Sequence, residues 1–284
     1  GTFGFQDTAI RNYRTGSSPR NFRLFNSRRI GLSSTRQPLP IAGGARLTGR
    51  IGDRFEVGLL DMQTRSLDGL SDGSDYSAEN FAVARAKGTF GNATIGGMFI
   101  NRQGQYGSER SAYNRSYGID ANVQLAPNVL MSGYWARTDD SSPVGSDANT
   151  GMFQTAWRNP FWNMSALFKH VGDGFSPETG FIDRTAVRRY FTTVGIHPQV
   201  NRFGIREINP YIDLDVYTDL DNAIETRGVE AGAVVSFLAG GQIAASVRDR
   251  HERLLSLIHI SEPTRRYAIG DGGVWVEKKK GGGG

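Results

Sequence analysis

The stretch Ser116–Leu125 reads SYGIDANVQL, and its apolar and polar residues alternate. A β-strand places successive side chains on opposite faces of its sheet, so one face of this stretch is apolar and the other polar. The apolar face carries Tyr117, Ile119, Ala121, Val123 and Leu125. The polar face carries Ser116, Gly118, Asp120, Asn122 and Gln124. This pattern predicts an amphipathic β-strand.

The same period of two recurs along much of the chain. In residues 226–237, Val229, Ala233 and Val235 alternate with Glu230 and Gly232. Residues 243–248 repeat the pattern, and less regular versions occur at 45–51, 54–64, 80–88, 93–101, 129–137, 151–158, 161–171, 187–197 and 205–217. No segment shows a sustained helical period. We therefore predict an all-β protein with about twelve antiparallel strands, most of them roughly nine to eleven residues long.

The connections between these ranges alternate between short and long. Turn-forming residues make the short ones, at Gly52-Asp53, Phe90-Gly91-Asn92, Ala126-Pro127-Asn128, Asn159-Pro160 and Gly240-Gly241. Polar segments make the long ones, at about 65–79, 102–115, 138–150 and 172–186, with a shorter one near 218–225. Hairpin turns join antiparallel neighbours. One end of the predicted sheet therefore carries tight turns and the other carries long loops.

Two architectures bury apolar strand faces of this kind. A soluble sandwich packs two sheets together, whereas a membrane barrel has longer strands, an apolar outer face, a polar interior and loops of unequal length at its two ends. Strand length and loop lengths favour an outer-membrane-type β-barrel, here incomplete. Its predicted lumen-facing residues are Arg85, Asp120, Asn122, Gln124 and Glu230. Its predicted lipid-facing residues are Tyr117, Ile119, Val123, Val229 and Val235. The aromatic residues Trp157, Phe161 and Trp162 flank one tight turn, as expected at the level of lipid headgroups.

The two ends of the chain differ from its centre. Residues 255–265 match a translated sequencing-library adapter, and Lys278–Lys280 followed by Gly281–Gly284 resemble homopolymer runs. We therefore interpret residues 251–284 as a non-native read-through tail. Residues 45–250 form the predicted barrel domain, and residues 1–44 a leading, plug-like segment. We expect natural sequence to be missing at both ends.

Several separated motifs resemble an uncharacterised family of bacterial outer-membrane barrel domains. These motifs are LFNSRRIG at 24–31, PIAGGARLTGR at 40–50, GLLDMQT at 58–64, AENFAVAR at 78–85, Asn101-Arg102 and PETGF at 177–181. In that family the barrel usually follows a secreted domain similar to the family-nine carbohydrate-binding modules. The resemblance covers about residues 1–250 and implies a barrel associated with glycan binding. The chain departs from the pattern because it lacks the binding domain and the last strands.

Chemistry-bearing motifs are few. The chain has no cysteine, and its four histidines lack the spacing of a metal site. The acidic group Asp213, Asp215, Asp219 and Asp221 is the best calcium candidate, but its spacing fits no defined calcium loop. Glu178 and Asp183 are the best candidates for a glycosidase acid and base, although both lie on one polar loop. We predict no catalytic residue, no cofactor and no metal.

Composition limits the remaining function classes. Apolar runs fall short of the ~18 residues that a spanning helix needs. The formal net charge is +5, but basic and acidic residues are interspersed, so we predict no nucleic-acid partner. The predicted function is an outer-membrane barrel in contact with lipid, acting as the anchor or pore for a missing carbohydrate-binding domain in glycan binding or uptake. The alternative is a soluble or peripheral β-domain of a carbohydrate-active hydrolase.

Overall fold

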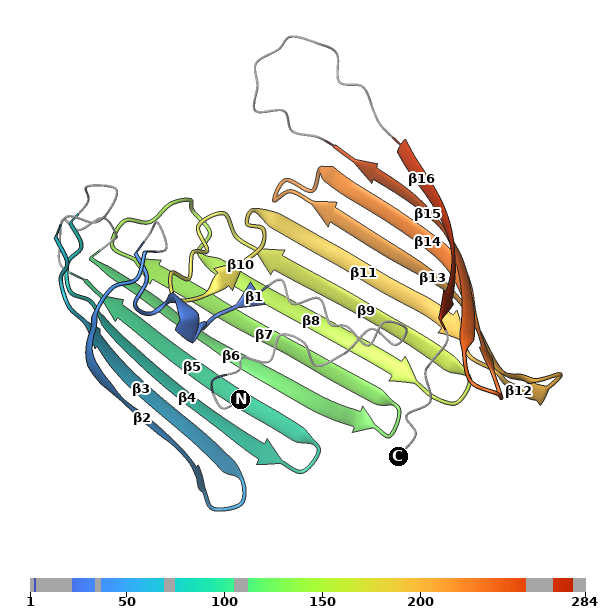
Figure 1. Ribbon diagram of the computed structural model, residues 1–284, viewed down its shortest axis with the longest axis horizontal. Coiled ribbons are helices and arrows are strands. Elements are labelled where there is room, and N and C mark those ends of the chain that lie inside the picture. The colour runs from blue at the N-terminus through green and yellow to red at the C-terminus, as the bar shows by residue number, and fades with distance from the viewer. Residues whose placement is uncertain are drawn as a thin grey trace, which may run out of the picture. The chain divides into compact units, whose positions relative to one another are not determined.

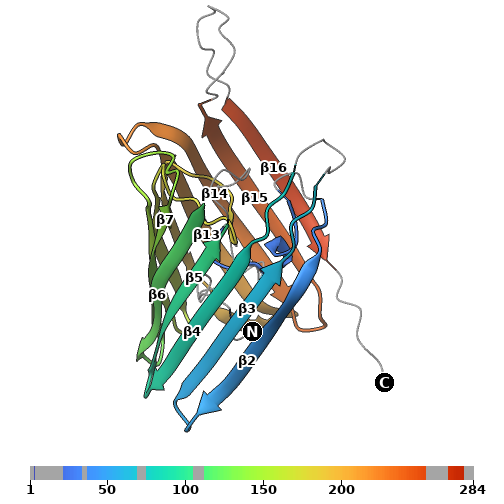
Figure 2. The same ribbon diagram turned by 90° about the vertical axis from the view of Figure 1, so that its left-hand side faces the viewer.

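The protein is almost entirely β-structure. The computed structural model describes residue 3 and residues 22–33, 37–68, 75–104, 112–253 and 268–277. Within these residues the one helical element is a single 3-10 turn, η1 (Ser27–Arg29). None of the helical structure in this part of the chain is long and apolar enough to cross a membrane. The strands are shown in Figure 1 and, turned by 90°, in Figure 2.

The chain folds as two compact units. The first comprises residues 1–125, 131–153 and 170–186. Its elements are β1 (Phe22–Arg23), η1, β2 (Ile41–Ile51), β3 (Phe55–Thr64), β4 (Asn80–Phe90), β5 (Ala93–Gln103), β6 (Tyr113–Ala126), most of β7 (Val129–Asp140), the first half of β8 (Asn149–Arg158) and β10 (Phe181–Ile182). The second unit holds the rest of β8, most of β9 (Trp162–Val171), β11 (Val187–Ile196), β12 (Gln199–Arg202), β13 (Ile205–Thr218), β14 (Ile224–Phe237), β15 (Gln242–Glu252) and β16 (Ala268–Glu277).

Strand pairing follows the order of the chain. The order is β2-β3-β4-β5-β6-β7-β8-β9-β11-β13-β14-β15-β16, with β12 also paired to β13 and with β1 paired separately to β10. Every pairing between β2 and β6 and between β11 and β16 is antiparallel. The predicted antiparallel all-β fold is therefore confirmed. Among the described strands the pairing order runs from β2 at one end to β16 at the other, so this order is open rather than circular.

The strand predictions are largely confirmed. Each of the twelve predicted ranges coincides with a long strand, and the tight turns and long connections of β2 to β7 lie at opposite strand ends (Figure 1). The structure adds the short strands β1, β10 and β12, together with β16, which lies within the predicted read-through tail. The first long strand also begins earlier than predicted, at Ile41. Gly44 permits this extension, because a Cβ there would lie 2.6 Å from the carbonyl oxygen of Asp61 on β3.

Burial in the first unit reverses the usual order of polar and apolar groups. Ile119 on β6 is 61% exposed, whereas the next residue, Asp120, is 3% exposed. Neighbouring strands repeat this contrast. Their exposed apolar side chains include Leu59, Ile95, Phe99, Trp135 and Phe153. The buried polar side chains include Arg85, Arg102 and Ser132 on those strands, and Asn114 and Ser116 on β6 itself. We call these the apolar face and the polar face of the sheet.

The polar face also holds an apolar cluster that alternation did not predict. Phe81 and Val83 on β4 and Met98 and Ile100 on β5 are buried on the same face as Arg85. The opposite face of β4 carries alanines at 82, 84 and 86. One face of β4 therefore carries small apolar side chains, and the other carries both large apolar and charged side chains. This makes the alternation of apolar and polar residues in its sequence weak.

The second unit has the same arrangement of faces. Val194, Ile212, Leu214 and Val247 are exposed. Thr193, Glu207, Asp213 and Ser236 are buried. In a soluble protein, large apolar side chains are more often inside and charged ones outside. Both units therefore bury polar side chains on one face and expose large apolar side chains on the other.

Candidate functional site: a buried polar network

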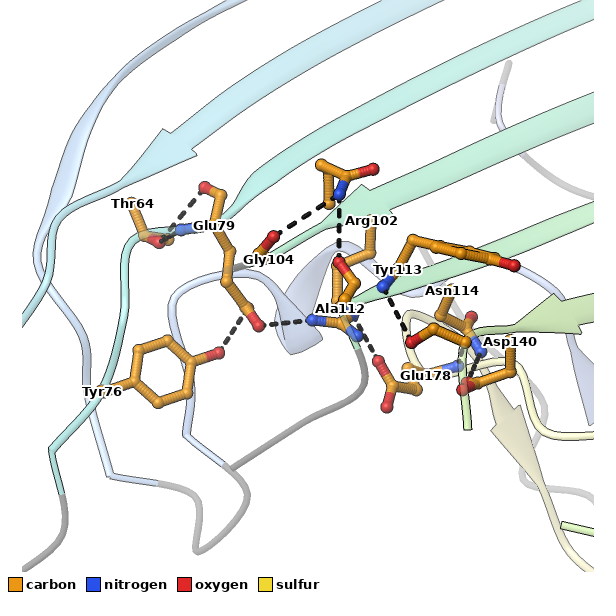
Figure 3. Close-up of polar contacts among 12 residues, drawn as sticks. Thr64, Tyr76, Glu79, Arg102, Gly104, Ala112, Tyr113, Asn114, Asp140 and Glu178 are labelled. Carbon is orange, nitrogen blue, oxygen red and sulfur yellow. Dashed lines mark hydrogen bonds and ion pairs between the residues drawn. The ribbon is translucent and has the colours of Figure 1, made fainter. Parts of the chain in front are cut away.

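A buried charged cluster of the first unit is centred on Arg102, at the end of β5. Its side chain is 0% exposed. One guanidinium nitrogen, Nη1, lies 2.6 Å from Oε1 of Glu79, and Nε contacts the Oε2 atom of Glu178 (Figure 3). A buried charge is tolerated when it is paired and hydrogen-bonded. Arg102 therefore links the start of β4 to the segment that follows β9.

Glu79 is held on several sides. The Tyr76 hydroxyl donates a hydrogen bond to its Oε2 atom. Its backbone N–H donates to the Thr64 hydroxyl at 2.9 Å, and the same hydroxyl donates to the Glu79 carbonyl oxygen at 3.2 Å. These contacts join the end of β3 to the start of β4. These hydrogen bonds hold the Glu79 carboxylate in place beside Arg102.

Asn114, at the start of β6, holds the backbone that carries Glu178. Its side-chain nitrogen donates to the carbonyl oxygen of Ser176 at 2.9 Å and to Asp140 at 2.7 Å. Its side-chain oxygen accepts the backbone N–H of Glu178 at 3.2 Å. The amide therefore binds both a donor and an acceptor of one short segment. Its contacts with Asp140 and Glu178 are drawn in Figure 3.

The segment 174–182 is also fixed from its other side. The backbone N–H of Asn26 donates to the carbonyl oxygen of Thr179 at 2.8 Å, and β1 pairs with β10. A Cβ on Gly180 would lie 2.3 Å from the carbonyl oxygen of Arg23, so only glycine fits this close approach. The predicted plug-like segment 1–44 thus contacts the loop that follows β9 through its described residues. We call Arg102, Glu79, Glu178 and Asn114 the latch network.

A second set of hydrogen bonds connects the loops at 141–148 and 172–186. The backbone N–H groups of Asp147 and Ser146 donate to the Asp173 carboxylate at 2.7 and 3.1 Å, and they lower its pKa. Burial raises the pKa of the Asp147 carboxyl, but hydrogen bonds from Asn149 and His170 outweigh burial and hold that pKa below its usual value. His170 Nε2 lies 2.7 Å from Asp147. Both carboxylates are therefore used to join loops.

The predicted lumen-facing residues all belong to the polar face. Arg85 and Asp120 form a bidentate pair at 2.5 and 2.9 Å, with both side chains 1% exposed. A Cβ on Gly96, between them in the sheet, would lie 2.6 Å from the Arg85 guanidinium. Asn122 is half-buried and Gln124 is exposed. The sequence identified both charged residues but not that they form a pair.

Glu230 lies in the second unit and is also paired. It accepts hydrogen bonds from Tyr211 at 2.8 Å and from Arg248 at 2.9 Å. Of the predicted lipid-facing residues, Ile119 is well exposed, and Tyr117, Val123, Val229 and Val235 are half-buried. Lipid contact for these five side chains stays a prediction.

The acidic calcium candidates have separate partners. Asp213 accepts a hydrogen bond from Thr193 at 2.8 Å, and Asp215 pairs with Arg189 at 2.8 Å. Asp219 accepts the backbone N–H groups of Asp221 and Ala223 at 2.9 and 2.8 Å. No group of three or more metal-ligating side chains occurs in the part of the chain that the structure describes.

The proposed acid and base have different surroundings. Glu178 belongs to the latch network, whereas Asp183 is exposed just after β10. The location of Glu178 gives it a structural role, and catalysis by this pair stays an untested hypothesis. Sequence reasoning missed Arg102, Glu79 and Asn114 as site residues. Extending the predicted strand 93–101 by one residue would have placed Arg102 on the same face as Ile100.

Comparisons with known proteins assign no family. No protein-family model matches the chain, and no curated protein matches it. The family resemblance of the motifs in residues 24–181 therefore stays a prediction. The reversed faces of the sheet are the feature from which a function is inferred.

Proposed function

We propose that this chain is the strand-forming part of an outer-membrane β-barrel, with its apolar face in lipid and its polar face lining the interior. In this role it anchors an attached domain or forms a pore for small polar solutes. Binding or uptake of glycans, through a carbohydrate-binding domain, is the associated activity that the motif resemblance implies. The proposal concerns the arrangement of the sheet and requires no catalytic group.

The observation that carries the proposal is the contrast between Ile119 and Asp120. These neighbours on β6 are 61% and 3% exposed, and the adjacent strands repeat the contrast. Burying apolar surface yields about 25 cal/mol per Å², so a continuous exposed apolar face favours a non-aqueous environment. Hydrocarbon supplies such an environment, while the polar groups of the other face stay paired inside.

The surface of the apolar face supports a lipid contact. An open apolar groove of about 400 Å³ lies on this face of the first unit. It is lined by Ile95, Ile119, Val123, Leu125, Trp135 and Phe153, among others. Acyl chains are flexible and fill grooves of this kind without requiring a polar partner.

Aromatic rings at one tight turn also agree with the proposal. In the second unit, Trp157 and Trp162 are stacked with centroids 6.5 Å apart, and Phe161 meets Trp162 edge-on at 5.3 Å. Trp157 and Phe161 are exposed. Tryptophan and other aromatic rings concentrate where a membrane meets water, and transmembrane barrels carry aromatic girdles at both interfaces.

Membrane extraction tests the proposal. When the chain is expressed with an export signal in a bacterium with an outer membrane, we expect it to sediment with that membrane. It should resist alkaline carbonate and dissolve in detergent, because hydrocarbon covers the apolar face. A chain that is folded and monodisperse in aqueous buffer without detergent would contradict the proposal.

A further inference from the structure

Strand β2 offers one long edge of the sheet to another strand. It pairs with β3 and is one end of the strand order, and all eleven of its residues are exposed. An edge strand presents a row of backbone N–H and C=O groups that a further strand can pair with. The side chains of β2 determine which strand fits.

Arginines dominate the polar face of β2. The register pairs Leu47 with Leu59, and Arg46 and Arg50 therefore lie on the opposite, polar face together with Thr48. Arg46 lies over the ring of Phe3, with its guanidinium carbon 5.3 Å from the centroid. Neither arginine forms an ion pair with any residue that the structure describes.

One row across the sheet shows how charges alternate on this face. Arg50 is opposite Glu56 on β3, and Glu56 is opposite Lys87 on β4. The Lys87 ammonium lies 2.8 Å from the Glu56 carboxylate. The row thus runs positive, negative, positive and ends at Arg50. Opposite charges stabilise directly opposed cross-strand pairs, so the next position in the row favours a carboxylate.

We propose that the free edge of β2 binds an antiparallel strand with Asp or Glu side chains opposite Arg46 and Arg50 and apolar side chains on its other face. The apolar face of the partner strand rests on the proposed membrane function. Its acidic face rests on the two arginines alone. A second copy of β2 is a poor occupant in the register that brings its arginines opposite one another. With Thr48 opposite its own copy, each Arg46 would face an Arg50, and like charges directly opposed are destabilising.

Synthetic peptides test directly whether acidic side chains are preferred opposite Arg46 and Arg50. Two fluorescent eleven-residue peptides of alternating threonine and valine differ only at two polar-face positions four residues apart, which are both glutamate or both lysine. Binding is measured to the whole chain, refolded in detergent micelles. We expect the glutamate peptide to bind about tenfold more tightly, because two attractive pairs replace two repulsive ones.

Reversing the charges of Arg46 and Arg50 tests whether the peptide preference arises at β2. The variant R46E/R50E should invert the preference and favour the lysine peptide. The matched control R54E/R65E changes the net charge equally at exposed arginines outside β2 and should keep the preference for glutamate. If the reversed variant does not fold, the two peptides on the unaltered chain still decide the question.

Three results would overturn the proposal. They are equal affinity for the two peptides, loss of the glutamate preference in R54E/R65E, and dimerisation of the unaltered chain that the glutamate peptide disrupts. Carbonate extraction of the chain expressed in the bacterial outer membrane is measured in parallel. Failure of extraction contradicts the membrane function, whereas failure of the peptide preference contradicts the acidic partner alone.

Discussion

Replacing Arg102 with methionine is expected to lower the free energy of unfolding by about 3 to 5 kcal/mol, because it leaves the buried carboxylate of Glu79 and the half-buried carboxylate of Glu178 without their cation. The Arg102 side chain is 0% exposed, and it pairs with Glu79 and Glu178. The loss is measured by urea titration in detergent micelles, followed by tryptophan fluorescence. Methionine keeps most of the length of the side chain, so the loss of charge rather than of volume dominates.

Two controls separate the latch network from a general loss of charge. Arg54, in the exposed turn after β2, is replaced by methionine and should change the unfolding free energy by less than about 0.5 kcal/mol. Adding Glu79→Gln and Glu178→Gln to Arg102→Met should recover part of the stability, because it removes the uncompensated charges. An Arg102→Met variant as stable as Arg54→Met would contradict the structural role of the network.

The substitution Ile119→Arg is expected to destabilise the membrane-inserted state by about 2 to 4 kcal/mol. This is the cost of a basic side chain that faces lipid near the bilayer centre. Ile119 lies in the middle of β6 on the exposed apolar face. The effect is measured as the fraction of chain that resists carbonate extraction and as the urea midpoint in lipid vesicles.

Asn122→Arg is the matched control for that variant. It introduces the same side chain three residues along β6, but on the polar face. We expect it to assemble nearly as well as the unaltered chain. Equal impairment by the two substitutions would show that the faces of β6 do not differ in environment, and it would contradict lipid contact at Ile119.

The sequence predicted a strand well where its apolar and polar residues alternate regularly. Ser116–Leu125 alternates without interruption, and β6 was predicted within a few residues of its ends. On β4, alanines on one face and Phe81, Val83 and Arg85 on the other gave a weaker pattern, so its buried apolar cluster was not predicted. Alternation identifies the faces of a strand when they differ strongly, and it gives little information when both are apolar.

The candidate site was harder to predict than the strands. Arg85 and Asp120 were both assigned to the polar face, but their pairing depends on the register across β5 and on the space left by Gly96. Arg102 was placed at the first position of a long loop, where charged residues are common. Its partner Glu178 lies 76 residues further along the chain, and local periodicity contains no information about such a contact.

The central claim is that lipid covers the apolar face, and a cysteine scan of β6 tests it most directly. The chain has no cysteine, so single substitutions from Tyr117 to Gln124 each carry one spin label in lipid vesicles. Accessibility to oxygen dissolved in the bilayer should alternate with period two, with maxima at Tyr117, Ile119 and Val123 and minima at Asp120 and Asn122. Uniform accessibility, or maxima at Asp120 and Asn122, would contradict the claim.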